Sequence, residues 1–394
     1  MKKEMKINGE RLYQNIKTLG QIGYVPEHGT TRMAYSDTYD QGRDYVKKLM
    51  EQAGLDTSID SVGNLTGVLQ GKKRQKISIG SHIDTVPDGG IYDGALGVLA
   101  GIELVRTLQE YDYQNQHDIE IIAFTEEEGN VIGGTFGSKA FAGVSQERDV
   151  LSKLSDYHMK PVDIQNAKRN PQDYKCYLEL HIEQGGVLES AGVPIGVVEG
   201  IFGIARYKVK VSGKANHAGS TPMNMRDDAL VKTSKMILRM VEIAQQTNPS
   251  MTCTIGKIEV KPGVVNVIPG EVEFCIELRC LNMDDIENAI KVFSEEFCSE
   301  QVCIERFLWQ RETRMDENLK EVLCQCCEKR RIPFMKIPSG AGHDAINMAL
   351  FTPTAMLFIP SIGGISHSIL EKSEKEDIER GTNLFLEAVL KIDA

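Results

Sequence analysis

The stretch Gly80-Ser-His-Ile-Asp-Thr-Val-Pro-Asp-Gly-Gly-Ile-Tyr-Asp-Gly94 places a histidine and carboxylates around a short loop. The apolar run before it, Ile77 to Ile79, predicts a β-strand. Because side chains alternate between the faces of a strand, His82 and Asp84 should lie on one side, where Asp84 can hold the imidazole in one tautomer. Asp93 lies in a Gly-rich turn before a helical pattern, and its two oxygens can bridge metal ions. Taken alone, the stretch fits either a metal site or a surface histidine with loop acids.

Three further apolar segments end in the same residue types. Residues 119–124 indicate a buried strand and run into Thr125-Glu-Glu-Glu-Gly129, where one carboxylate can face a metal and its neighbour a bound water. An alternating stretch carries His181 near its end, and residues 356–360 lead into a Gly-rich loop with His367. Strand ends that offer His, Asp or Glu are typical of an α/β sheet that presents a site at the carboxyl ends of its strands.

Eight motifs along the chain make the sequence similar to the M20 metallopeptidase family. They are Gly-Ser-His-Ile-Asp-Thr-Val at 80–86, Asp-Gly at 93–94, Glu-Glu-Gly at 127–129, Glu-Leu-His-Ile-Glu-Gln-Gly at 179–185, Asn-His-Ala-Gly-Ser-Thr-Pro-Met at 216–223, Asn-Val-Ile-Pro at 266–269, Ser-Gly-Ala-Gly-His-Asp at 339–344 and Gly-Ile-Ser-His at 364–367. The sequence resembles most the branch that hydrolyses ureido groups, which contains N-carbamoyl-L-amino acid hydrolases, β-ureidopropionases and allantoate amidohydrolases. His181 separates this branch from general M20 exopeptidases, which usually have an acid at that position.

The pattern of the chain predicts an α/β protein of two domains. Residues 1–204 and 318–394 alternate strand and helix patterns, whereas residues 205–317 give the order β-α-β-β-α-β of a ferredoxin-like α+β insert. The expected elements of the insert are strands near 206–211, 252–258, 271–279 and 302–308 and helices near 227–246 and 284–297. The resemblance implies the same layout, a Zn-peptidase-like catalytic metal-binding domain interrupted by a lid and dimerisation domain.

The resemblance also implies two metal ions per subunit. It assigns His82, Asp93 and His181 to one ion, and Asp93, Glu128 and His367 to the other. Mixed imidazole and carboxylate ligands suit zinc, manganese, cobalt or nickel. Two ions that share a carboxylate can lower the pKa of a bridging water and polarise the carbonyl that it attacks.

Glu127 is the predicted general base, which takes a proton from the attacking water and can pass it to the leaving nitrogen. Chemistry alone leaves Glu126 open for this role, and the family register of two acids before a glycine selects Glu127. Asp84 is the predicted catalytic partner that orients His82. His217 resembles the oxyanion-stabilising histidine of the family, although a lone histidine is more often structural.

Polar residues elsewhere are expected to bind the substrate. Asn266 and Arg279 match positions that clasp the substrate's carboxylate, for which the bidentate fork of an arginine is well suited. Gln184 and Asn216 are plausible amide-binding groups.

The roles of two other sites stay open. Gly342 and His343 lie in a Gly-rich loop, where His343 could contact the substrate or support another residue. Arg226 could bind a carboxylate, or it could form an ion pair with Asp228 at the start of a helix.

The sequence departs from its family after Gly129. Many members of the branch carry Ser-Arg-Phe there, whereas this chain has Asn130-Val131-Ile132. Allantoate has two ureido groups and would need an extra polar contact. The apolar pair therefore favours an N-carbamoyl amino acid with an apolar or small side chain.

Composition limits the partners and the location of the protein. A chain of 394 residues suits two domains, and its formal net charge of -11 argues against binding of nucleic acid. No apolar run approaches the length of a membrane span, and the start of the chain lacks the apolar region of a signal peptide. Nine cysteines without zinc-type spacing favour a cytoplasmic protein with free thiols.

These observations favour an amidohydrolase that converts an N-carbamoyl-L-amino acid into the amino acid, ammonia and carbon dioxide. Its partner is thus a small ureido substrate with a carboxylate. Allantoate amidohydrolase is the alternative, followed by β-ureidopropionase or a dipeptidase. A non-catalytic binding protein on the same fold is disfavoured because the ligands and the base are all present. A homodimer is expected, in which an edge strand of the insert pairs with its copy and the oxyanion histidine reaches the partner's site.

Overall fold

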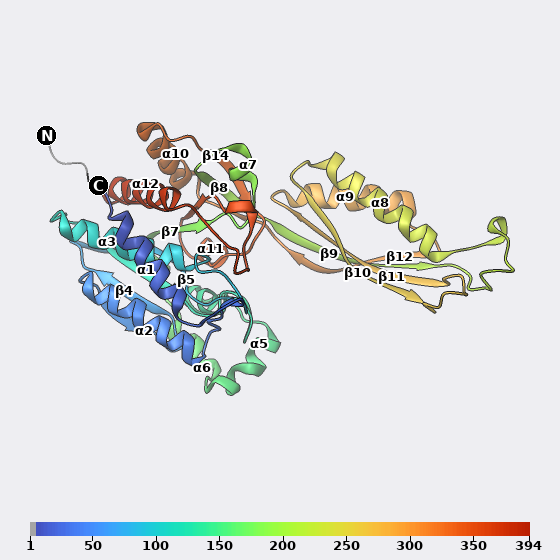
Figure 1. The fold of residues 1–394 in the computed structure, drawn as a ribbon, viewed down its shortest axis with the longest axis horizontal. Coiled ribbons are helices and arrows are strands. Elements are labelled where there is room, and N and C mark those ends of the chain that lie inside the picture. The colour runs from blue at the N-terminus through green and yellow to red at the C-terminus, as the bar shows by residue number, and fades with distance from the viewer. Residues whose placement is uncertain (1–4) are drawn as a thin grey trace. The chain divides into compact units, whose positions relative to one another are not determined.

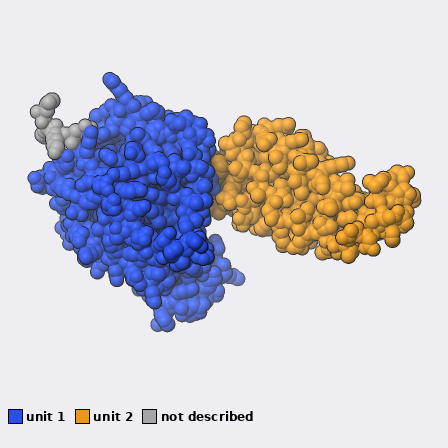
Figure 2. Space-filling view, in the orientation of Figure 1, with its two compact units in different colours: residues 1–199, 315–394 blue, residues 200–314 orange. Residues whose placement is uncertain are grey.

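The computed structural model describes residues 5–394. The chain divides into two compact units, one made of the segments up to Glu199 and Met315–Ala394, the other of Gly200–Arg314 (Figure 2). The boundaries expected from the sequence, at 204/205 and 317/318, lie within a few residues of the limits of these units.

The first unit is built around a mixed nine-stranded sheet with the order β13-β8-β15-β7-β5-β6-β4-β3, in which β14 also pairs with β8 (Figure 1). Its centre consists of four mutually parallel strands, β15, β7, β5 and β6. Antiparallel strands flank this centre, β8 beside β15 and β4 beside β6. The strands are β3 (Asp56–Ile59), β4 (Leu65–Leu69), β5 (Lys73–His82), β6 (His117–Phe124), β7 (Tyr174–Ile182), β8 (Gly196–Ile201), β13 (Thr313–Arg314), β14 (Met335–Ser339) and β15 (Thr354–Ile359).

The central strands are apolar on both faces because helices cover both faces. Ile119 and Ile121 of β6 belong to the large core cluster that also contains much of α3, whereas the ring of Phe124 packs edge-on against Phe141 of α4, 5.5 Å away. Helix α3 lies so close to the sheet that a Cβ on Gly97 would come 2.5 Å from the carbonyl of Leu180. The strands β1 (Tyr24–Val25) and β2 (Gly29–Thr30) form a separate antiparallel pair. The helices of this unit are α1 (Gly9–Gln21), α2 (Asp37–Gln52), α3 (Ala95–Glu110), α4 (Phe136–Ala142), α5 (Arg148–Lys153), α6 (Pro161–Ala167), α7 (Val187–Ala191), α10 (Glu317–Arg330), α11 (Ala345–Met348) and α12 (Lys375–Asp393).

The second unit contains an antiparallel sheet with the order β10-β11-β9-β12. Strand β9 buries every second side chain against α8 and α9, which explains its strict alternation. The order of elements along the chain is the β-α-β-β-α-β expected from the sequence. The elements are β9 (Gly203–Ser212), α8 (Ala229–Thr247), β10 (Thr252–Lys261), β11 (Glu271–Cys280), α9 (Met283–Phe297) and β12 (Val302–Gln310). Among residues 5–394, none of the helices has the length and apolar character needed to cross a membrane.

Candidate metal centre and active site

Residues far apart in the sequence meet at the carboxyl ends of the central strands. His82 is the last residue of β5, His181 lies one residue before the end of β7, and Glu128 follows β6. Asp93 lies between β5 and α3, and His367 lies in the segment that follows β15. Parallel strands share one carboxyl edge, so the topology brings these side chains together.

The first group consists of His82, Asp93 and His181. The Oδ1 atom of Asp93 lies 3.5 Å from the Nε2 atom of His82 and 3.2 Å from the Nε2 atom of His181. All three residues are buried, with exposed fractions of 2%, 6% and 1%. Their candidate ligand atoms all lie within 4.8 Å of one another, which is compatible with one bound cation.

Backbone carbonyls orient both histidines of this group. The Nδ1 atom of His82 lies 3.0 Å from the carbonyl oxygen of Asp84, and that of His181 lies 2.9 Å from the carbonyl oxygen of Ile182. With the proton of a neutral ring on Nδ1, each ring donates to its carbonyl and presents Nε2 to the site beside Asp93. This is the tautomer in which histidine binds a metal.

The position of Asp84 differs from the one expected. Strand β5 ends at His82, so Asp84 lies beyond the strand, and its carbonyl is nearer to His82 than its carboxylate, which is 3.5 Å from Nδ1. The carboxylate instead accepts the backbone N–H of Glu128 at 3.1 Å. Asp84 thus connects the turn after β5 with the turn after β6.

The second group consists of Asp93, Glu128 and His367. The Nε2 atom of His367 lies 3.3 Å from Oδ2 of Asp93 and 3.5 Å from Oε2 of Glu128. Asp93 therefore faces the first group with one oxygen and the second group with the other. The amide of Gln184 lies beside it and donates from Nε2 to Oδ2 of Asp93 at 2.6 Å.

Glu127 and Glu126 point into different surroundings. The Oε2 atom of Glu127 lies 3.7 Å from Nε2 of His82, so its carboxylate faces the first group. The Oε1 atom of Glu126 instead accepts the backbone N–H groups of Val131 at 2.7 Å and Ile132 at 2.6 Å. Glu126 has a positive φ of 60°. The geometry supports Glu127 as the acid that faces the site.

Crowding of carboxylates changes the proton affinities of the site. Burial raises the pKa of Glu127 well above its usual range, and the negative charges of Asp344 and Glu128 add to this effect. Burial also raises the pKa of Glu128 to about 7. For His82, burial alone would lower the pKa, but nearby carboxylates, above all Glu127, raise it well above its usual value.

The residues present fit divalent cations. Imidazole nitrogens and several carboxylates converge within the two groups, and a dication would offset their crowded negative charge. A further group of potential ligands combines Glu179, His181 and His343. The oxygens of Glu179, however, accept the hydroxyl groups of Ser81 at 2.8 Å and Tyr177 at 3.1 Å, so Glu179 ties β5 to β7 beneath the site.

The Gly-rich loop after β14 brings His343 against the first group. Its ring packs on that of His181 with centroids 4.5 Å apart, and its Nε2 atom lies 3.0 Å from the hydroxyl of Ser339. Burial and the neighbouring His181 lower the pKa of His343 well below its usual value, so the ring is neutral. Gly342 is exposed in the same loop.

The second unit gathers another set of the expected residues. His217 is exposed, and its Nδ1 atom accepts the backbone N–H groups of Gly219 at 3.0 Å and Ser220 at 3.1 Å. Asn216 accepts the N–H of His217 through its side chain at 2.8 Å, and the carbonyl of Asn266 accepts the N–H of Ala218 at 3.0 Å. These contacts place Asn216, His217 and Asn266 on two adjoining segments.

Arg279 lies on β11 in the same unit. Its Nε atom donates to Oε1 of Glu277 at 2.8 Å, and the other oxygen of Glu277 accepts from Nε of Arg206 at 2.6 Å. Two guanidinium groups thus flank one carboxylate on the exposed face of the sheet.

Arg226 and Asp228 do not pair at the start of α8. The guanidinium of Arg226 donates to the carbonyl oxygens of Thr221, at 3.0 Å, and Ala218, and so braces the loop that carries His217. Asp228 is the N-cap of α8 and accepts the N–H of Leu230 at 2.9 Å.

Ile132, which stands where many members of the branch have Phe, does not favour an apolar substrate. Ile132 is 1% exposed and belongs to a core cluster with Val62, Phe136 and Val150. Its side chain fills the interior of the unit, so it carries no information about the substrate's side chain.

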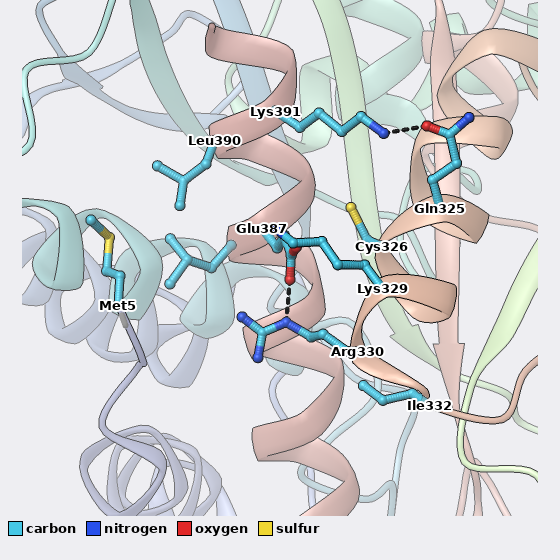
Figure 3. A pocket seen from close by; sticks show the side chains of 10 residues that line it. Met5, Gln325, Cys326, Lys329, Arg330, Ile332, Glu387, Leu390 and Lys391 are labelled. Carbon is cyan, nitrogen blue, oxygen red and sulfur yellow. Dashed lines mark hydrogen bonds and ion pairs between the residues drawn. The ribbon is translucent and has the colours of Figure 1, made fainter. Parts of the chain in front are cut away.

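A separate cavity of about 690 Å³ lies beside α10 and α12 (Figure 3). Glu387 pairs there with Lys329 and Arg330, and Lys391 donates to Gln325. The cavity contains none of the site residues expected from the sequence, and its charged groups are engaged with one another.

Imidazoles and carboxylates at the carboxyl edge of an α/β sheet, joined by a shared aspartate, are the arrangement of metal-dependent hydrolases. The chain belongs to the peptidase family M20/M25/M40, whose family model matches residues 78–391, and to its hydantoinase/carbamoylase branch. It is a hydrolase that acts on carbon–nitrogen bonds of linear amides other than peptides.

Two curated relatives and one solved structure illustrate this membership. The chain is 36% identical over 405 residues to an N-carbamoyl-L-amino acid amidohydrolase of Geobacillus stearothermophilus, with 98% of this chain and 99% of the relative covered. It is also 36% identical over 393 residues to an allantoate amidohydrolase of Escherichia coli (strain K12), with 94% and 95% covered. The crystal structure of a hydantoinase/carbamoylase family amidase from Burkholderia ambifaria matches with a TM-score of 0.91 and 33% identity, covering 100% of this chain and 99% of that one.

Proposed function

We propose that the protein is a dinuclear amidohydrolase that removes the ureido group of an N-carbamoyl-L-amino acid. The observation that carries this proposal is Asp93, whose two oxygens face two separate groups of ligands while Glu127 lies beside the first. His82, His181 and Asp93 would hold one ion, and Asp93, Glu128 and His367 the other. Such a pair of ions, when bound, polarises a carbonyl and makes a water molecule more acidic.

Glu127 is proposed as the group that moves the proton. Its carboxylate faces the first group of ligands, where it can accept a proton from the attacking water. The water oxygen adds to the ureido carbon, the bond from that carbon to the terminal nitrogen breaks, and Glu127 returns the proton to this nitrogen, which leaves as ammonia. The remaining N-carboxy amino acid loses carbon dioxide and gives the free amino acid.

Gln184 is proposed to bind the ureido group. Within residues 5–394, its buried Oε1 atom has no hydrogen-bond partner, while its Nε2 atom contacts Asp93. An unpaired buried carbonyl oxygen is costly, and an N–H of the ureido group would satisfy it.

His217 is proposed to stabilise the developing oxyanion. Because its Nδ1 atom accepts two backbone N–H groups, the proton of the neutral ring lies on Nε2, which is then a donor. Such a donor stabilises negative charge on the carbonyl oxygen during attack. Asn216, Asn266 and Arg279 are proposed to bind the rest of the substrate, with Arg279 on its carboxylate.

Allantoate is the second candidate substrate because the Escherichia coli relative, an allantoate amidohydrolase, is as similar to this chain as the carbamoylase of Geobacillus stearothermophilus. A substrate panel separates the two. The metal-loaded protein would receive N-carbamoyl-L-amino acids, their D enantiomers, N-carbamoyl-β-alanine and allantoate, with ammonia release as the readout. We expect the highest kcat/KM for an N-carbamoyl-L-amino acid. A higher value for allantoate would establish the alternative, and the absence of activity on every ureido compound would overturn the proposal.

A further inference from the structure

Glu371 is a buried carboxylate that the motifs of the sequence do not single out. It lies between β15 and α12, four residues after His367, and is 6% exposed. Its Oε1 atom accepts the backbone N–H groups of Tyr92 at 2.9 Å and Asp93 at 3.1 Å. It therefore contacts the turn that carries the shared aspartate.

The other oxygen of Glu371 contacts the segment that carries His367. The hydroxyl of Ser366, the residue directly before His367, lies 2.8 Å from Oε2 of Glu371. The same hydroxyl lies 2.8 Å from Oδ2 of Asp93. Glu371 and Ser366 thus join two ligand-bearing segments that are more than 270 residues apart in the sequence.

The groups around Glu371 accommodate its buried carboxylate. A buried carboxylate is costly unless several donors surround it, and two backbone N–H groups and a hydroxyl do so here. Gly90 passes so close that any Cβ at this position would overlap the carboxylate of Glu371. A side chain at residue 90 would therefore displace Glu371.

The two groups of ligands differ in how firmly the fold holds them. His82 and His181 lie on central strands, and backbone carbonyls orient their rings. His367 lies outside the strands, has a positive φ of 54°, and its side chain is 48% exposed. The second group therefore depends more on contacts between loops.

We propose that Glu371 is a positioning residue that aligns Asp93 with His367 and thereby sets the affinity of the second ion. This inference rests on the proposed pair of ions. Loss of Glu371 should weaken the ion of Asp93, Glu128 and His367 and leave the ion of His82, Asp93 and His181 nearly unchanged. Replacement of groups that orient metal ligands typically lowers metal affinity about 10- to 100-fold.

Binding of Co²⁺ to metal-free protein tests the proposal without an activity assay. Titrations followed by visible absorption and calorimetry would resolve two binding steps in the wild type, and His367→Ala would identify the step that belongs to the second ion. In Glu371→Ala, that step alone should weaken about 10- to 100-fold. Ser366→Ala should weaken it less, because the bonds to the turn at Asp93 remain.

Glu371→Gln provides the conservative rescue. Its carbonyl oxygen can still accept both backbone N–H groups and its amide can still meet Ser366, so the second step should stay within a few-fold of the wild type. It also keeps the test decisive if Glu371→Ala does not fold.

Glu183→Ala is the matched control. Glu183 is also a buried carboxylate, 8% exposed, and it accepts the N–H groups of Val187 at 2.7 Å and Leu188 at 2.9 Å, but it holds α7. We expect this variant to lose thermal stability and to keep both binding steps.

Unchanged Co²⁺ binding in folded Glu371→Ala, or equal weakening of both steps, would overturn the inference. A wild type that binds only one ion would overturn the proposed pair of ions and this inference with it. Two normal steps in a wild type without activity on ureido compounds would contradict the proposed substrate alone.

Discussion

Glu126 and Glu127 are adjacent in the sequence, yet their carboxylates have different surroundings and different predicted roles. Glu126 holds the segment 131–133 through backbone N–H groups, and Glu127 faces His82. Adjacent acids look alike in a sequence, and only their contacts in the fold distinguish them. From the sequence, only the family register selected Glu127 over Glu126 as the base. The structure adds that Glu127 is the acid that faces His82.

Glu127→Gln keeps the shape of the side chain and removes the proton acceptor. We expect turnover to fall by at least about 10²-fold while metal content stays near that of the wild type. Steady-state ammonia release and elemental analysis on the same preparation would measure both. If Glu126→Gln lost turnover in this way and Glu127→Gln did not, the assignment of the base would be wrong.

The pKa of Glu126 predicts a pH dependence of stability. Burial, and after it the charge of Asp84, raises the pKa of Glu126 to about 7. Between a pH of about 4.3, the pKa of Glu in the unfolded chain, and about 7, the folded protein holds a proton that the unfolded chain has released. The contribution of Glu126 to the free energy of unfolding therefore falls as the pH rises from about 4.5 to 7.

The side chain of the Glu126→Gln variant does not titrate between about pH 4.5 and 7. Relative to the wild type, its free energy of unfolding should improve by about 1–3 kcal/mol between pH 5 and pH 8, as measured by urea denaturation at both values. A difference between the two proteins that is the same at both pH values would show that Glu126 does not titrate in this range.

Among the secondary-structure elements, strands that are buried on both faces were the ones best predicted from the sequence. The apolar runs before His82, Thr125 and Pro360 are strands, because fully covered parallel strands are apolar throughout. Most of the basic stretch at 72–76 belongs to β5, which begins at Lys73. Strand β4 pairs with β6 and not with β5, a long-range choice that local patterns do not contain.

Contacts between distant loops also could not be predicted, because local sequence patterns do not show which segments the sheet brings together. Glu371 and Ser366 meet Asp93 only because the sheet brings their segments together. Asp228 was ambiguous for a local reason, since a carboxylate just before a helix fits both a cap and an ion pair.

Asp228→Ala should destabilise α8 by about 1 kcal/mol, because the first N–H groups of the helix lose their acceptor. Chemical denaturation of the variant would measure the loss. Asp284→Ala, in the first turn of α9 where Asn282 is the cap, is the control and should change stability by less. Equal effects of the two substitutions would argue against a capping role for Asp228.

For the whole molecule, the expected homodimer follows from the second unit's own sheet, in which β10 and β12 are edge strands. An unpaired edge can continue a sheet across a two-fold axis. Light scattering should give twice the mass of one chain, and mixtures of His217→Ala with Glu127→Gln subunits should regain activity. In such a heterodimer, one site has an intact base and receives an intact His217 from its partner. No recovery despite proven subunit exchange would refute a shared site.

The measurement that tests the central claim most directly is ammonia release from an N-carbamoyl-L-amino acid before and after removal of metal. With His82, Asp93, Glu128, His181 and His367 as the proposed ligands, we expect chelation to abolish turnover and zinc, manganese, cobalt or nickel to restore it. Undiminished turnover by protein shown to be free of metal would contradict the account.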